Sequence, residues 1–193
     1  MAQFIRKRKY KRAIDIGSGS GVLALYIATV LQCSYVDAIE IQAELYKCLI
    51  KTVEINNLSN IMHPHNGDIK LFRPIQHYDL IVCNPPYREK KRGKVSENKI
   101  KEQARFTNTL TVEDIFIFAL KYLKNAGFLY LSYDVDLMVD LIELSRKYRL
   151  ELKRMMFLHN DINRCAKLVF MEFRKNAGKE LIVDPPFIQK MTM

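Results

Sequence analysis

The chain has 193 residues, of which 49% are hydrophobic, and this is enough for one domain with a full core. No apolar run approaches the roughly 18 residues of a membrane span, and the basic N-terminus lacks the apolar stretch of a signal peptide. A net charge of +10 results from 31 lysine and arginine residues against 21 acids, but these cations are clustered rather than evenly spread.

The first predicted strand, near 12–16, contains Asp15 and ends in a glycine turn that leads into a helix. A strand followed by a turn and the start of a helix exposes backbone N–H groups that can bind a ligand. Gly17, Gly19 and Gly21 permit positive φ angles and a close approach of the ligand to the backbone. Their G-x-G-x-G spacing differs from the dinucleotide fingerprint G-x-G-x-x-G. A carboxylate before the turn disfavours a pyrophosphate and favours a cationic amino-acid group, although many tight turns without a ligand also use glycine.

The next two predicted strands each lead to a carboxylate. The strand near 35–40 ends at Glu40, about 20 residues beyond the glycine turn, which is the spacing at which an acid reaches ribose hydroxyls. The strand near 61–65 is followed by Asp68, which could accept a hydrogen bond from an adenine amine. Both have a structural alternative: a solvated strand-end charge for Glu40, and an Asx turn or helix N-cap for Asp68.

The segment Asn84-Pro85-Pro86-Tyr87 directly follows a fourth predicted strand, near 78–83. The Asn84 side-chain oxygen and the Pro85 carbonyl could accept both N–H bonds of a planar amine, and Tyr87 could stack on its ring. The two prolines fix φ, so little further ordering is needed when a substrate binds. The alternative is a strand that ends in a Pro-Pro turn without function.

A long polar stretch, residues 88–110, follows and carries a cluster of cations. Such loops are commonly functional or disordered. Because this one adjoins a candidate base pocket, we interpret it as a substrate-side loop that holds phosphates. The cations assigned to it are Arg88, Lys90, Lys91, Arg92 and Lys94. A separate cluster, residues 6–12, reads Arg-Lys-Arg-Lys-Tyr-Lys-Arg.

The remaining elements complete an alternation of strands and helices. Thr111 and Asp114 predict a capping box at the start of a helix. Predicted helices lie near 21–32, 42–56, 111–125 and 136–147, and a fifth strand lies near 127–133. This alternation predicts an α/β fold with a parallel sheet and helices on both faces.

The end of the chain differs, because the runs 150–158 and 165–174 have no helix between them. Two strands joined in this way predict an antiparallel hairpin at one edge of the sheet. No linker or repeat interrupts the chain, so we expect residues 1–193 to form a single domain.

Cysteine and histidine positions argue against a metal or disulfide framework. There is no C-x-x-C pair, and three of the four cysteines lie in or beside apolar runs, so we expect free thiols and a cytoplasmic location. The histidines show no ligand spacing, so we expect no metal. The residues concerned are Cys33, Cys48, Cys83, Cys165, His63, His65, His77 and His159.

Together these motifs resemble those of class I S-adenosylmethionine-dependent methyltransferases that act on exocyclic amines. The shared pattern covers nearly the whole chain and consists, in order, of Asp15-x-Gly17-x-Gly19-x-Gly21, Glu40, Asp68 and Asn84-Pro85-Pro86-Tyr87. Within that class the chain is most similar to the bacterial enzymes that methylate N6 of an adenine beside the anticodon of a valine tRNA. Further segments that fit this subfamily are Ala104-Arg105, Leu123-Lys124-Asn125-Ala126-Gly127 and Val183-Asp184-Pro185-Pro186.

The resemblance implies a Rossmann-like sheet of seven strands, mostly parallel, with an antiparallel C-terminal hairpin. It implies S-adenosyl-L-methionine as cofactor, with Asp15 and the glycine turn facing the methionine moiety and Asp68 the adenine amine. We expect Glu40 to bind the ribose hydroxyls and Ile41 to pack on the adenine ring. The family normally carries a segment before the first strand that helps to close the cofactor pocket. Only residues 1–11 precede that strand here, so we expect weak cofactor affinity.

We therefore expect a monomer that methylates the N6 amine of an adenine in RNA, specifically a tRNA near its anticodon, with Asn84, Pro85 and Tyr87 at the catalytic site. Two alternatives stay open: a protein-glutamine N-methyltransferase, because a glutamine amide is also a planar amine, and a non-catalytic RNA-binding module on the same fold. The first normally carries a helical N-terminal domain. A DNA adenine methyltransferase would need a target-recognition domain, for which no residues remain.

Overall fold

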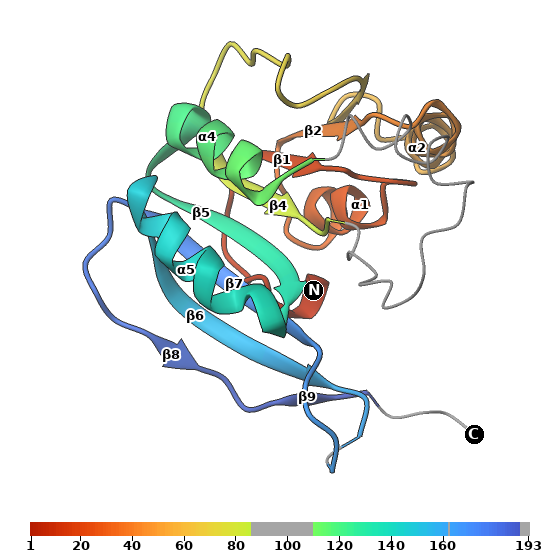
Figure 1. Ribbon diagram of the computed structural model, residues 1–193. Helices are drawn as coiled ribbons and strands as arrows, with labels where there is room; N and C mark the ends of the chain where they lie inside the picture. Colours follow the sequence, from red (N-terminus) through yellow and green to blue (C-terminus); the bar gives the residue numbers. More distant parts are fainter. Residues whose placement is uncertain (86–109, 162, 190–193) are drawn as a thin grey trace, which may run out of the picture.

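A single sheet of nine strands forms the centre of the molecule (Figure 1). We describe a computed structural model of the chain for residues 1–85, 110–161 and 163–189. The strands are β1 (Arg12–Ile16), β2 (Tyr35–Glu40), β3 (Met62–Asn66), β4 (Tyr78–Cys83), β5 (Leu123–Asp134), β6 (Leu150–His159), β7 (Leu168–Lys175), β8 (Ile182–Val183) and β9 (Phe187–Ile188).

The strand order is β3-β2-β1-β4-β5-β7-β6-β8, and β9 also pairs with β6. Strands β1 to β5 are parallel to one another, and β7 is antiparallel to both of its neighbours, β5 and β6. This confirms the predicted α/β class, the mostly parallel sheet and the antiparallel hairpin. The seven predicted strands are β1 to β7, and the two-residue strands β8 and β9 extend the sheet beyond them.

Helices cover both faces of the sheet, as predicted (Figure 1). Helices α1 and α2 share one buried cluster with η1, and α4 and α5 share the other. The helices are η1 (Ala2–Phe4), α1 (Val22–Thr29), α2 (Ala43–Ile55), α4 (Val112–Tyr122), η2 (Val135–Leu137) and α5 (Met138–Lys147). None of these described helices is long and apolar enough to cross a membrane.

The predicted capping box at the start of α4 is confirmed. The backbone N–H of Asp114 donates to Thr111 Oγ1 at 3.1 Å, and that of Thr111 donates to Asp114 Oδ2 at 3.0 Å. The end of this helix was predicted less well, because α4 stops at Tyr122 and β5 begins at the next residue. The ammonium group of Lys175 donates to the carbonyls of Leu120 at 2.5 Å and Leu123 at 2.7 Å. An interaction over more than 50 residues therefore closes the helix.

A buried polar cluster fastens the first four strands together. Asp37 of β2 is 1% exposed and accepts hydrogen bonds from Arg12 at 2.9 Å, His65 at 2.7 Å and Tyr78 at 2.6 Å. Burial alone would raise the pKa of Asp37, but the bonds from His65 and Tyr78 and the charge of Arg12 outweigh it and lower this pKa. Because β1, β2, β3 and β4 each contribute one side chain, the cluster fixes their relative positions.

Candidate functional site

The candidate residues meet at the carboxyl ends of the central strands. From β1 the chain first builds β2 and β3 on one side, and then crosses to β4 and β5 on the other. Ligands of open α/β sheets bind outside the carboxyl ends of the strands at such a switch point. In Figure 1 β1 and β4 lie side by side in the middle of the sheet.

Asp15, Glu40 and Asn84 share one face of the sheet at this edge. Asp15 on β1 lies in register with Ala38 on β2 and with Val82 on β4. Glu40 and Asn84 each lie two residues beyond one of these partners. Side chains alternate along a strand, so both point to the same face as Asp15.

Asp15 is a buried carboxylate that keeps one oxygen without a hydrogen bond. The residue is 2% exposed, and burial raises the pKa of its carboxyl to about 7, although the backbone N–H of Ala24 lowers it. Among the described residues, Asp15 Oδ2 and Ser18 Oγ are buried and make no hydrogen bond. Unpaired buried polar atoms are costly, and a cationic donor placed here would offset that cost.

The turn between β1 and α1 has the conformation that glycine permits. The φ angles are +69° at Gly17, +57° at Gly19 and +88° at Gly21, all in the left-handed region. The backbone N–H of Gly17 donates to the Ile39 carbonyl at 2.9 Å, and that of Gly19 donates to Glu40 Oε2 at 2.8 Å. The turn is therefore attached to the end of β2.

We expect Gly21→Ala to destabilise the fold. A Cβ at Gly21 would lie 2.5 Å from Leu49 Cδ1, and its φ disfavours any L side chain. These two effects together should cost about 1–3 kcal/mol, and thermal unfolding should show a lower Tm. Gly67→Ala is the matched control, because a Cβ there has no atom within 4 Å. Equal Tm values for the two variants would contradict the expected crowding at Gly21.

Glu40 is buried at the site, which excludes the alternative of a solvated strand-end charge. It is 4% exposed, and its two oxygens accept from the backbone N–H groups of Gly19 and Gln42, both at 2.8 Å. The Asn66 amide donates to the Glu40 carbonyl at 2.9 Å and ties β3 to this point. A carboxylate has about four acceptor positions, so two backbone bonds leave it able to bind hydroxyl groups.

Asp68 forms the Asx turn that was its structural alternative. Its Oδ1 accepts from the backbone N–H of Lys70 at 2.9 Å, and its Oδ2 lies 3.4 Å from Lys70 Nζ. The turn does not exclude a further acceptor role, because the side chain keeps lone pairs. Ile41, the residue proposed to contact a ring, is 42% exposed just beyond Glu40.

Asn84 is exposed at the edge, and Pro85 beside it is buried. Sequence analysis missed the neighbour of Asn84, which is Ser132 on β5. This fully buried serine donates its hydroxyl hydrogen to Asn84 Oδ1. The only sequence signal was a polar residue within an apolar strand. The other predicted residues of this side lie outside the described residues: Tyr87, Arg88, Lys90, Lys91, Arg92 and Lys94.

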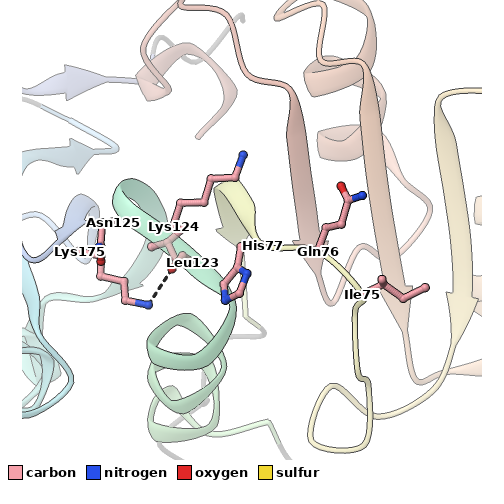
Figure 2. A pocket seen from close by; sticks show the side chains of 7 residues that line it. All are labelled: Ile75, Gln76, His77, Leu123, Lys124, Asn125 and Lys175. Carbon is pink, nitrogen blue, oxygen red and sulfur yellow. Dashed lines mark hydrogen bonds between the residues drawn. The ribbon is translucent and has the colours of Figure 1, made fainter.

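A hollow of about 500 Å³ lies at the opposite, amino edge of the sheet (Figure 2). Its cations are already engaged: Lys175 binds the carbonyls at the end of α4, and Lys124 lies 2.7 Å from Asp79. It is lined by Ile75, Gln76, His77, Leu123, Lys124, Asn125 and Lys175. Of the predicted site residues that the structure describes, none lines this hollow. Within the described residues, no three histidine, cysteine, aspartate or glutamate side chains gather as a metal site would require.

The fold and the motifs at its carboxyl edge are those of a methyltransferase. A family model described as the methyltransferase small domain matches residues 1–147, and the chain belongs to this family. It is similar to tRNA1(Val) (adenine(37)-N6)-methyltransferases: it is 31% identical to the one from Proteus mirabilis over 142 residues, and 27% identical to the one from Flavobacterium psychrophilum over 175. The family and the fold imply S-adenosylmethionine as cofactor.

These matches cover different shares of the proteins concerned. The Proteus match covers 72% of this chain and 56% of that relative, and the Flavobacterium match covers 88% and 74%. The chain thus spans only about half the length of several curated relatives that it matches, such as 49% for the one from Cronobacter sakazakii. Among solved structures, a predicted O-methyltransferase from Agrobacterium tumefaciens aligns over 96% of this chain and 83% of its own, with a TM-score of 0.71 at 17% identity. Such low identity shows a shared fold alone.

Proposed function

We propose that this protein transfers a methyl group from S-adenosylmethionine to the N6 amine of an adenine in tRNA, near the anticodon. The observation that carries the proposal is the placement of an unpaired buried carboxylate oxygen, on Asp15, and an amide oxygen, on Asn84, at one edge and on one face of the sheet. The first suits a cation and the second suits an amine. Similarity to tRNA adenine-N6-methyltransferases supports this choice of substrate.

The residues present fit the cofactor. The buried oxygens of Asp15 and Ser18 that make no hydrogen bond would hold the charged amino-acid end. Glu40 would accept from the ribose hydroxyls, Ile41 would cover the adenine ring, and Asp68 would accept from its amine. When bound, S-adenosylmethionine supplies a methyl group that is already activated by the sulfonium, so the chain has no nucleophile of its own to generate.

On the substrate side, the chain must make a weak amine reactive. The lone pair of an aromatic amine is conjugated with the ring, which makes it a poor nucleophile. Hydrogen bonds to Asn84 Oδ1 and the Pro85 carbonyl would favour a tetrahedral nitrogen and stabilise the positive charge that develops on it. The nitrogen would gain the methyl group that the sulfonium gives up, and would then lose one proton to water. Tyr87 would stack on a base that has left its helix.

RNA is the better substrate proposal than a protein glutamine. The cations proposed for the loop after Tyr87 would hold phosphates and would have no equivalent use on a neutral amide side chain. The curated relatives compared with this chain, from Proteus, Flavobacterium and other bacteria, act by name on a tRNA adenine. We propose a cytoplasmic location for the same reason, because that is where tRNA is found.

The test is transfer of a labelled methyl group to unmodified tRNA, followed by digestion and nucleoside analysis. The expected product is N6-methyladenosine at a single position of a valine tRNA. Label on protein glutamine instead would select the second enzyme class. A shift in Tm with S-adenosylmethionine but no transfer to any acceptor would leave a cofactor-binding module without this activity.

We expect Glu40→Gln to weaken cofactor binding by about 1–3 kcal/mol, because charge-assisted bonds to the ribose hydroxyls become neutral ones. Isothermal titration calorimetry with S-adenosylmethionine measures the change directly. Glu54→Gln is the control, since Glu54 is an exposed acid on α2. Unchanged affinity in the Glu40 variant would mean that this carboxylate only fastens the glycine turn.

A further inference from the structure

The basic run 6–12, hereafter the strap, contains two kinds of cation. Those at its two ends, the anchors, pair with buried acids, and those between them are exposed. Arg6 Nε lies 2.9 Å from Glu172 Oε2, and Arg12 Nη2 lies 2.9 Å from Asp37 Oδ2. Both acids are 1% exposed. The cations at the two ends of the strap therefore form ion pairs with buried carboxylates and stabilise the fold.

The residues between the anchors are arranged differently. Tyr10 points inward, is 2% exposed and packs edge-on against Phe128 with 6.3 Å between ring centroids. The other four residues are exposed, and no carboxylate of the described residues forms an ion pair with any of them. We call them the strap cations: Lys7, Arg8, Lys9 and Lys11. They lie within six residues of one another on a backbone that is fixed at both ends.

A further cation, Arg174 of β7, contacts the same aromatic ring as Arg8. The guanidinium carbons of Arg8 and Arg174 lie 4.8 Å and 5.1 Å from the centroid of the Phe128 ring. Glu151 is the cross-strand neighbour of Arg174, but it forms its ion pair with Arg146, at 3.1 Å. Two like charges beside one ring repel each other, and a bound anion would relieve that repulsion.

The strap packs on the same face of the sheet as the proposed methyl-transfer site. Tyr10 and Phe128 belong to the buried cluster beneath α1 and α2, the face to which Asn84 also points. Phe128 precedes Ser132, the partner of Asn84, by four residues on β5. At roughly 3.3 Å per residue, the ring lies about 13 Å from the site along the strand. A folded RNA with its target base at Asn84 would reach the strap with its backbone.

We propose that the strap cations, together with Arg174, bind backbone phosphates of the RNA substrate at a distance from the methylated base. This inference rests on the proposed function, because it takes the polyanion to be the RNA that enters the site. The strap positions the substrate and does not touch the reacting atoms. It therefore determines affinity for a large RNA rather than the rate of methyl transfer.

The test is a variant that lacks the four exposed strap cations and keeps the two arginines that anchor the strap. The strap variant combines Lys7→Gln, Arg8→Gln, Lys9→Gln and Lys11→Gln, and leaves Arg6 and Arg12 intact. The control variant removes four exposed charges from other elements: Lys51→Gln, Lys121→Gln, Lys147→Gln and Lys179→Gln. Both variants have the same net charge. Thermal unfolding of each should stay close to that of the wild type, because all eight side chains are exposed.

Fluorescence anisotropy with unmodified tRNA, measured across a salt series, gives the first readout. Removal of each phosphate-binding cation should reduce the log–log salt slope by roughly 0.7–0.9, so the slope of the strap variant should fall by about 3, with roughly 10- to 100-fold weaker binding at low salt. The second readout is kinetic: KM for tRNA should rise while kcat is retained. A short hairpin carrying only the target loop should be methylated equally by wild type and strap variant.

The outcomes separate this inference from the proposed function. If the strap variant keeps the wild-type salt slope and affinity, the strap does not bind the RNA. The same conclusion follows if the affinity of the control variant falls as much as that of the strap variant. Wild-type protein that binds tRNA through the strap but transfers no methyl group supports the surface and overturns the proposed activity. Wild-type protein that does not bind tRNA overturns both.

Discussion

Replacing Asn84 with alanine should reduce methyl transfer by roughly 10²- to 10⁴-fold, the scale seen when one preorganised polar group is removed from a charged transition state. The amide oxygen is assigned to the amine, so binding of S-adenosylmethionine should stay nearly unchanged. The measurement is single-turnover transfer to tRNA, paired with calorimetry on the cofactor. Single-turnover conditions isolate the chemical step from product release.

Asn60→Ala is the matched control for this variant, because Asn60 is an exposed asparagine just before β3, at the amino edge of the sheet and thus opposite the site. A second control is the fold itself, since Asn84 accepts a hydrogen bond from the buried Ser132. The Tm of the Asn84 variant should therefore be compared with that of Ser132→Ala. Wild-type turnover in the Asn84 variant would show that the amine binds elsewhere.

Asp15→Asn should weaken cofactor binding and, at the same time, stabilise the ligand-free protein. Cofactor affinity should fall by about 10- to 100-fold, because the charged amino group is deprived of a charge-assisted partner. The ligand-free variant should nevertheless unfold at a higher temperature than the wild type at pH 8, because an amide is less costly to bury than a carboxylate. Asp140→Asn, an exposed acid on α5, is the control.

The pH dependence of this effect has a definite sign. The pKa of Asp15 is about 7 in the folded protein, against an ordinary 3.8, so the folded state binds the proton more tightly. The ionised carboxylate thus opposes folding increasingly as the pH rises from about 4 to 7, by up to about 4 kcal/mol, and by a constant amount above that. Chemical denaturation at pH 5 and pH 8 should therefore show a larger stability advantage of Asp15→Asn at the higher pH. An equal advantage at both would contradict the raised pKa.

The sequence predicts most of the elements because their signals are local. The bounds predicted for β1, β2 and β4 are those of the structure, since each is an apolar run with a polar residue or glycine turn at its end. The capping box of α4 needs only four consecutive residues. Because the carboxyl ends of parallel strands meet at one edge, the sequence also places Asp15, Glu40 and Asn84 together.

Interactions between distant residues could not be read in the same way. The end of α4 depends on Lys175, which follows Leu123 by 52 residues. Ser132 looks like any polar residue in a strand until Asn84 is placed beside it. In the sequence, the basic run 6–12 looks like one uniform cluster. Only the positions of Glu172 and Asp37 show that Arg6 and Arg12 form buried ion pairs that stabilise the fold.

The short strands β8 and β9 have a consequence for how copies of this protein behave at high concentration. They pair with four of the ten residues of β6 and thereby cover part of its outer edge. The new edge is a poor template for another chain, because each strand has two residues and Pro185 and Pro186, which have no N–H group, lie between them. Arg154 on β6 holds this tail through Asp184 at 2.7 Å. We therefore expect the tail to disfavour edge-to-edge pairing between copies of the protein.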